Sequence, residues 1–194
     1  MEKTLKKYLD EDRFAHTIGV MYTAAALAMA HNGNIEMAQT AGLLHDCAKC
    51  IPNKKKLQLC EEYQVSVTNF EREHPFLIHA KLGAAIAKDK YDVKDREILN
   101  AIAWHTTGKP DMTLLEKIIY IADYIEPHRD KAPHLPYIRQ LAFSDLDACM
   151  YEILKDTLEY LGSAPQEIDE TSRQAFMFYK RLQEDKNRKG EVYG

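Results

Sequence analysis

Histidines and aspartates recur along this chain in contexts that favour metal chemistry. One of them, Asp123, lies inside the apolar run Ile118–Ile125, where an ionised carboxylate is costly unless a positive charge neutralises it. A divalent metal supplies that charge, and imidazole and carboxylate are its ordinary ligands. The candidate ligands are His16, the adjacent pair His45 and Asp46, His79, His105 and Asp123. We expect the other histidines, which are His31, His74, His128 and His134, to be ordinary hydrogen-bonded residues.

The segments that carry these side chains have the patterns of helices. Apolar residues at three- and four-residue spacing predict a helix from about Asp12 to Asn32. Asn34 can cap a second helix, which ends near His45 because Pro52 prevents much continuation. Further helices are predicted at about 53–63, 74–88, 95–105, 113–125, 136–143, 145–161 and 169–184.

Strand signals are confined to Val65–Val67, a segment too short to found a sheet. No repeat or Pro/Gly-rich linker divides the chain. The sequence therefore predicts an all-α fold, a single helical bundle of roughly eight helices over residues 1–185, followed by a polar tail at 186–194.

Size and composition exclude several classes of protein. The 194 residues suit one domain, and 45% apolar with 29% charged residues allow a core beneath a mixed-sign surface. With a net charge of −4, the chain is not expected to bind nucleic acid. The longest nearly uncharged apolar stretch, Ile18–Ala30, is too short to cross a membrane, and acidic residues precede it where a signal peptide would be basic. We expect a cytoplasmic protein, whose alternating apolar and charged helices are compatible with a homodimer.

The four cysteines are expected to be free thiols. Cys47 and Cys50 form a C-x-x-C, but no second pair completes a zinc ribbon, and no βαβ pattern surrounds them to suggest a redox site. We therefore assign Cys47 and Cys50 no part in metal binding.

The order His16, His45-Asp46, Asp123 resembles the signature of the HD superfamily of metal-dependent phosphohydrolases, which are all-α. The finer motifs are Leu-Leu-His-Asp-Cys-Ala-Lys at 43–49, His79-x-x-x-Gly83, Trp104-His105-Thr106 and Ala-Asp-Tyr-Ile-Glu-Pro-x-Arg at 122–129. They resemble the YqeK family, bacterial enzymes that split dinucleoside tetraphosphates symmetrically. The resemblance extends from about Leu5 to Leu182.

This resemblance implies a two-metal site. His16, His45, Asp46 and Asp123 would hold one ion, and His79 and His105 would hold a second, with Asp46 bridging. Six ligands also exceed what one site with an open position can use, whereas they suit two metals about 3.5–4 Å apart. Mixed nitrogen and oxygen ligation fits Fe, Mn, Ni, Co or Zn better than Mg or Ca, and the resemblance points to iron.

The same resemblance assigns roles in catalysis and substrate binding. The nucleophile would be the water between the metals, so Asp46, Asp123 and Lys49 are the expected catalytic residues. Lys49 and Arg129 would contact phosphates, although a solvated lysine and a surface salt bridge are the plain alternatives. Thr171 and Arg173, near the start of the last helix, resemble a segment of the family that contacts the nucleotide.

The substrate rests on the resemblance alone, and other functions stay open. A neighbouring HD phosphohydrolase that acts on mononucleotides or cyclic dinucleotides would share all the metal ligands. A non-catalytic nucleotide-binding regulator would keep the fold, and a helical interaction domain would use the histidines only as core residues.

Overall fold

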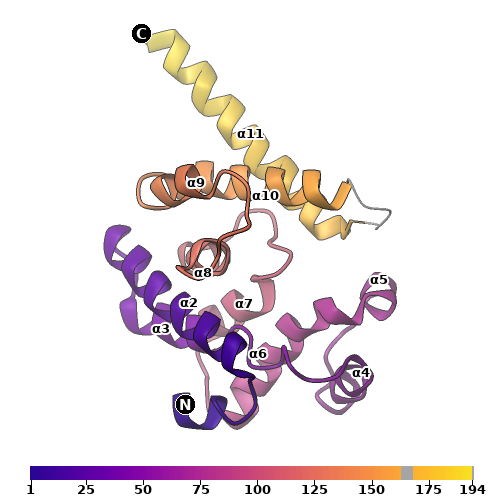
Figure 1. The fold of residues 1–194 in the computed structure, drawn as a ribbon. Coiled ribbons are helices and arrows are strands. Elements are labelled where there is room, and N and C mark those ends of the chain that lie inside the picture. The colour runs from indigo at the N-terminus through magenta and orange to yellow at the C-terminus, as the bar shows by residue number, and fades with distance from the viewer. Residues whose placement is uncertain (163–167, 194) are drawn as a thin grey trace.

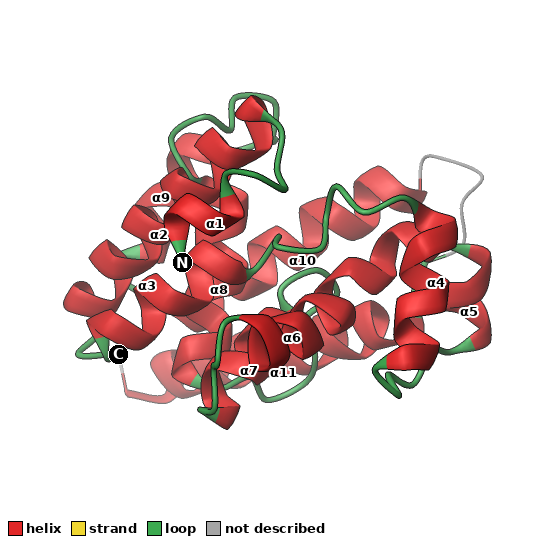
Figure 2. Cartoon of the chain, turned by 90° about the horizontal axis from the view of Figure 1, so that it is seen from below, coloured by secondary structure: helices red, strands yellow, loops and turns green. Residues whose placement is uncertain are grey.

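The computed structural model describes residues 1–162 and 168–193, the last five of them as backbone only. Within these ranges the chain is helical and contains no strand, which confirms the all-α prediction (Figures 1 and 2). The helices are α1 (Glu2–Leu5), α2 (Glu11–Ala30), α3 (Ile35–Leu44), α4 (Asn53–Glu62), α5 (Asn69–Glu73), the 3₁₀ helix η1 (Pro75–Ile78), α6 (His79–Lys90), α7 (Arg96–Trp104), α8 (Leu114–Ile125), α9 (Leu135–Ala142), α10 (Leu146–Gly162) and α11 (Glu170–Tyr193).

This is more than the roughly eight helices expected, because the additional ones are short. The four-residue α1 carries too little periodicity to be recognised. The five-residue α5 has a capping box, in which Thr68 Oγ1 accepts from the Glu71 amide at 3.1 Å and the Glu71 carboxylate accepts from the Thr68 amide at 2.8 Å. The helix expected from about His74 is broken by η1, so that α6 begins only at His79.

The last helix is longer than its sequence pattern predicts. It continues through Tyr193, whereas we expected an end near Glu184 and a polar tail from 186. Lys186 lies on this extension, and its ammonium lies 2.9 Å from the Asp145 carboxylate just before α10. This contact ties the extension to the bundle, although the end of α11 projects beyond the other helices (Figure 1).

Helix α8 lies at the centre of the bundle and packs against α2, α3, α7, α9 and α10. It begins at the predicted capping box, where Thr113 and Glu116 exchange side-chain and backbone hydrogen bonds. Ile118, Ile119 and Ile121 are almost completely buried, and each such side chain contributes about 2–3 kcal/mol of hydrophobic stabilisation. Asp123 is therefore carried on a helix anchored in the core, with its own side chain 22% exposed.

Helices α2 and α3 approach each other closely at Gly42. A Cβ atom on Gly42 would lie 2.9 Å from Met21 Cα, so no larger residue fits there without moving the backbone of α2. Asn34 caps α3 as predicted, with its side chain accepting from the Met37 amide at 3.0 Å. The close packing brings the rings of His16 and His45 to a centroid separation of 5.4 Å.

Among the described residues, no helix combines the length and the apolar character needed to cross a bilayer.

Candidate metal centre

The structure brings all six predicted ligands together from five helices. His16 lies on α2 and Asp123 on α8, whereas the other four lie at helix ends. His45 and His105 are the residues that cap the C-termini of α3 and α7, Asp46 follows His45, and His79 is the first residue of α6.

Asp46 lies in the middle of the six. Its Oδ1 is 3.1 Å from His79 Nε2 and 3.5 Å from His105 Nε2, whereas its Oδ2 is 3.5 Å from His45 Nε2 and 3.9 Å from His16 Nε2. Each oxygen therefore faces a different pair of imidazoles. This is the geometry that a bridging carboxylate requires.

Asp123 lies on the His16 and His45 side of the cluster. Its Oδ1 is 3.0 Å from His16 Nε2 and 3.9 Å from His45 Nε2. On the opposite side, the Nε2 atoms of His79 and His105 are 3.1 Å apart, and the hydroxyl of Thr106 lies 3.2 and 3.1 Å from them. The candidate ligands thus lie in two groups, matching the two sets that the sequence resemblance implies.

All four imidazoles are oriented through their Nδ1 atoms. His45 Nδ1 is 2.7 Å from the Gly42 carbonyl, His79 Nδ1 is 2.6 Å from the Phe76 carbonyl and His105 Nδ1 is 2.7 Å from the Ile102 carbonyl. Each acceptor lies three residues earlier, in the last turn of a helix, where carbonyls lack a partner within the helix. A histidine at such a position donates Nδ1–H to that carbonyl and directs the lone pair of Nε2 away from the helix end.

His16 lies within a helix and uses a side chain in place of a carbonyl. Its Nδ1 is 3.0 Å from Oε1 of Glu126, which is fully buried. Oε2 of Glu126 accepts from the His128 amide at 2.7 Å and lies 3.0 Å from His128 Nδ1. Gly19 leaves room for this carboxylate, because a Cβ there would lie 2.5 Å from Oε2.

The protonation states of His45, His79 and the two carboxylates suit metal binding, whereas at His16 the Asp123 and Glu126 carboxylates outweigh burial and raise the pKa. Burial lowers the pKa of His45 and of His79 to about 4, so both imidazoles are neutral at pH 7 and their Nε2 lone pairs are free. Burial alone would raise the pKa of Asp46 and of Asp123. The neighbouring histidines outweigh burial, His45 most strongly at Asp46 and His16 at Asp123, and they hold both pKa values below the usual range. Both carboxylates are therefore ionised.

Buried polar atoms at the centre of the cluster lack hydrogen bonds. Nε2 of His16, Nε2 of His45 and Oδ1 of Asp46 are inaccessible to solvent and make none, although other polar atoms lie near them. The potential ligand atoms of His16, His45 and Asp123 lie within 4.8 Å of one another, and so do those of His45, Asp46 and His105. Unsatisfied buried polar groups are rare in proteins, and bound divalent ions would satisfy these.

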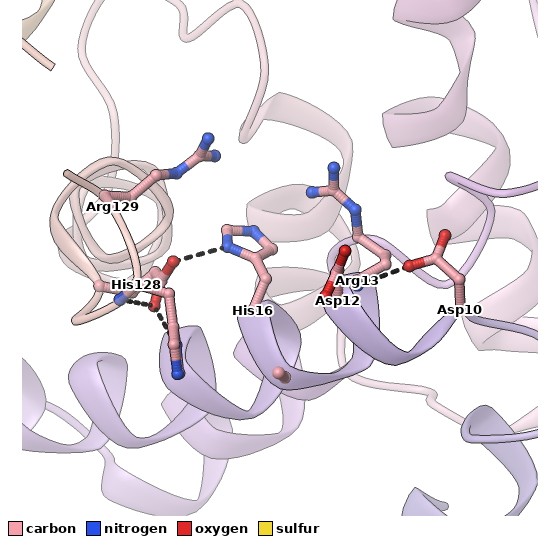
Figure 3. Close-up of a pocket in the computed structure, with 8 residues that line it drawn as sticks. Asp10, Asp12, Arg13, His16, His128 and Arg129 are labelled. Carbon is pink, nitrogen blue, oxygen red and sulfur yellow. Dashed lines mark hydrogen bonds and ion pairs between the residues drawn. The ribbon is translucent and has the colours of Figure 1, made fainter. Parts of the chain in front are cut away.

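Three cationic side chains surround the ligands. Lys49 Nζ lies 3.3 Å from His79 Nε2, and Arg129 Nη2 lies 2.8 Å from Asp123 Oδ1, so both predicted phosphate contacts reach the cluster. The third is Arg13, whose Nη1 lies 2.8 Å from Asp46 Oδ2. In Figure 3, Arg13 and Arg129 lie on either side of His16.

Arg13 and Glu126 were not singled out from the sequence. Arg13 precedes His16 by three residues, a spacing that places both on one face of α2, so the pattern Arg-x-x-His would have revealed it. Glu126 gives no such local signal, because it lies 110 positions from the histidine that it orients.

Two cavities adjoin the cluster and share His128 and Arg129. One is about 380 Å³ and is lined mainly by polar groups, among them Asp12, Arg13 and His16 (Figure 3). The other, which we call the α8–α10 cavity, is about 620 Å³; it begins at the ligands His105 and Asp123 and extends to Asp156, Tyr160 and Leu161. His128, expected to be an ordinary residue, is thus part of both walls.

The structure does not bring Thr171 and Arg173 to this cluster. Helix α11 begins beside the loop after His105, where Ser172 Oγ donates to the Thr107 carbonyl at 3.1 Å. Arg173 is exposed and lines a separate cavity with Gln174 and Arg181. Neither Thr171 nor Arg173 lines the two cavities beside the cluster.

The remaining candidates behave as expected. All four cysteines are free thiols; Cys47 Sγ donates to the Gly83 carbonyl and Cys50 Sγ to the Asp10 carboxylate. His31 Nε2 lies 2.7 Å from the Ala142 carbonyl, and His134 Nδ1 lies 3.3 Å from an oxygen of Asp156.

Comparisons with known proteins agree with this site. The model of the HD domain family matches residues 13–128, which include all six candidate ligands. The symmetrical bis(5'-nucleosyl)-tetraphosphatase of Bacillus subtilis is 38% identical over 84% of this chain and 87% of its own length. The protein of the same name from Staphylococcus aureus is 37% identical over 82% of each chain.

A solved structure has the same fold. The crystal structure of a predicted HD superfamily hydrolase involved in NAD metabolism, from Clostridium acetobutylicum, superposes with a TM-score of 0.90 at 35% identity, over 93% of this chain and 95% of that one. The protein described here therefore belongs to the HD domain family, whose members depend on divalent metals.

Proposed function

We propose that this chain is a dimetal hydrolase that cleaves dinucleoside tetraphosphates symmetrically to two nucleoside diphosphates. The observation that carries the proposal is the set of four Nε2 atoms and two carboxylates around one point, with Asp46 between two pairs of imidazoles. The names of the relatives from Bacillus subtilis and Staphylococcus aureus support the same activity.

His16, His45, Asp46 and Asp123 would hold one metal, and Asp46, His79 and His105 the other. Iron is our first assignment, with Mn, Ni, Co and Zn as the other ions that suit these ligands. Two divalent ions held by these residues would supply a hydroxide nucleophile at neutral pH and would neutralise charge on the phosphoryl oxygens.

The protein's own cations bind and orient the phosphates. Lys49 lies on the His79 side of the cluster, whereas Arg13 and Arg129 lie on the His16 side. The two arginines are paired with the carboxylates of Asp46 and Asp123. Their guanidinium groups can instead contact a phosphate chain, which carries the charge that accumulates during attack at phosphorus.

The two cavities favour a substrate with two ends. They lie beside the same cluster and share His128 and Arg129, so a phosphate chain across the metal ions can extend into both. A mononucleotide would occupy only one of them. This arrangement supports a dinucleoside polyphosphate over the mononucleotide alternative.

Product analysis tests the proposal. The metal-loaded protein is incubated with diadenosine tetraphosphate and the nucleotides are separated; we expect ADP as the product. AMP with ATP, or no turnover, would contradict the proposal. Asp46→Asn should abolish cleavage, whereas Asp89→Asn, which alters an exposed carboxylate bonded to Tyr63, should leave it unchanged.

A further inference from the structure

The N-terminus of α4 combines free backbone donors with a run of lysines. Its cap residue is Pro52, which offers no side-chain hydrogen bond, and the first amide bonded within the helix is that of Lys56, which donates to the Pro52 carbonyl at 2.9 Å. Among the described residues, nothing accepts from the amides of Asn53, Lys54 and Lys55. Free amides at a helix start, together with the helix dipole, favour an anion.

The charges at this end of α4 are the reverse of those that stabilise a helix. Acidic side chains are favourable in the first turn, whereas here Asn53 is followed by three lysines and the first turn holds no carboxylate. Lys55 lies 3.8 Å from Glu62 on the same helix, so its charge is partly compensated. Lys54 is exposed and forms no ion pair with the part of the chain that the structure describes. An anion bound at this end would correct the mismatch.

Lys56 is a buried cation without a counter-ion. It is 3% exposed and lies one turn before the buried Cys60, on the face of α4 that packs against the bundle. Within the described residues no carboxylate forms an ion pair with its ammonium, and its one partner is the neutral side-chain oxygen of Asn53, at 3.2 Å. Burying a charge with so little compensation is costly, so the ammonium favours a ligand that brings negative charge.

The ammonium of Lys56 lies at the same helix end as the free amides. Asn53 is the first residue of α4, and its side-chain oxygen is the acceptor for Lys56 Nζ. Because Asn53 is exposed, its side chain can rotate into solvent and leave the ammonium to another acceptor. An anion in place of that amide oxygen would accept from Lys56 and from the backbone amides together.

The charged groups around Lys56 do not provide this anion. Burial lowers the pKa of Lys56 and the charge of Lys49 lowers it further, whereas Asp46 raises it. The Asp46 carboxylate already accepts from Arg13 at 2.8 Å and faces the imidazoles of the cluster. The start of α4 therefore carries an excess of positive charge, next to the lysine that reaches the metal centre.

We propose that the N-terminus of α4 is an anion site that binds a phosphate group, held by the three free amides and by the ammonium of Lys56. A phosphate group fits better than a carboxylate, because its several charged oxygens can accept from the amides and from the ammonium at once. The residues of this site line neither cavity at the metal centre. The group can come from free phosphate, or from a polyphosphate chain that extends from the cluster past Lys49.

Thermal melting of the metal-loaded protein with and without inorganic phosphate tests the site. In phosphate-free buffer, Lys56→Met should raise the melting temperature by about 2–4 °C, because it removes an uncompensated buried charge and keeps the length of the side chain. Phosphate should stabilise the unaltered protein more than this variant, since loss of the charged hydrogen bond weakens binding at α4 by about tenfold or more. Phosphate bound at the metal ions acts on both proteins alike, so the difference reports on α4. An equal response to phosphate would overturn the proposal.

Asn53→Asp tests the same site without removing the lysine. The introduced carboxylate would pair with Lys56 in the first turn of α4, so this variant should also melt at a higher temperature and respond less to phosphate. Lys88→Met, at an exposed position of α6, is the control and should respond as the unaltered protein does. If Asn53→Asp responds to phosphate as strongly as this control, the assignment is wrong.

Kinetics distinguish the two sources of the phosphate group. With diadenosine tetraphosphate as substrate, a KM raised about tenfold in Lys56→Met assigns the site to the substrate's own chain, and an unchanged KM assigns it to free phosphate. Only this measurement rests on the proposed function. If no tetraphosphate is cleaved, the melting results still decide whether α4 binds phosphate; if cleavage is intact but the melting differences are missing, the α4 site alone is refuted.

Discussion

Replacing Glu126 with glutamine tests how the first metal ligand is positioned. One oxygen of Glu126 accepts from His16 Nδ1 at 3.0 Å, and the other accepts from the His128 amide at 2.7 Å. A glutamine has one carbonyl oxygen and one amino group. In either orientation, one of the two donors therefore faces an N–H group and loses its partner.

The expected cost follows from this mismatch. An unsatisfied buried donor costs about 1–3 kcal/mol, which should appear as a lower free energy of unfolding. Loss of a group that orients a metal-bound histidine typically weakens metal binding by about 10- to 100-fold, which corresponds to about 1.4–2.8 kcal/mol. For Glu126→Gln we therefore expect both a lower melting temperature and weaker binding of one of the two ions.

The assay is a competition between the metal-free protein and a chelator for Mn²⁺, combined with thermal melting. Glu116→Gln is the matched control, because Glu116 is also almost completely buried, accepts from the Thr113 amide at 2.7 Å and lies 2.8 Å from Lys109 Nζ, with no contact to a ligand. The control should lower the melting temperature without changing metal affinity. Unchanged metal affinity in Glu126→Gln, or an equal loss in Glu116→Gln, would show that Glu126 does not orient a metal ligand.

Three further predictions concern the same cluster. Gly19→Ala places a Cβ 2.5 Å from Oε2 of Glu126, the carboxylate that orients His16. The chelator competition should therefore show metal affinity reduced by about tenfold or more. Wild-type affinity in this variant would count against this role of Gly19. The double variant Cys47→Ser with Cys50→Ser should retain its full metal content by elemental analysis. The Cys47 thiol donates to the Gly83 carbonyl and the Cys50 thiol to the Asp10 carboxylate, so neither hydrogen bond involves a candidate metal ligand. Loss of an ion would contradict this prediction. Burial lowers the pKa of His45 and His79 from 6.5 to about 4, so the unfolded chain binds protons before the folded one as the pH falls through this interval. The metal-free protein should therefore melt at a lower temperature at pH 5 than at pH 7.5, and equal melting temperatures would show that these imidazoles are not buried and neutral.

The sequence points to the six candidate ligands through local signals, and the structure brings these side chains together. Asp123 stands out as a carboxylate in an apolar helix, and His45 as a histidine followed by a carboxylate near a helix end. The helix ends themselves follow from short-range chemistry, such as the Asn34 cap and the Thr113–Glu116 capping box, which the structure confirms. Spacing and capping thus placed most of the elements that hold the site.

Contacts between residues far apart in the sequence could not be predicted from local spacing and capping. Nothing near Glu126 in the sequence indicates that it orients His16, because the pairing depends on how α8 packs against α2. The placement of Arg173 is a second example, since the start of α11 lies beside the loop after His105 but directs this side chain to the exterior.

We propose that six side chains hold two metals with Asp46 between them. An anomalous difference map from crystals of the Mn²⁺-loaded protein tests it most directly. We predict two peaks about 3.5–4 Å apart, one beside Nε2 of His16 and His45 and the other beside Nε2 of His79 and His105, with an oxygen of Asp46 next to each. A single peak, or peaks remote from Asp46, would contradict the account.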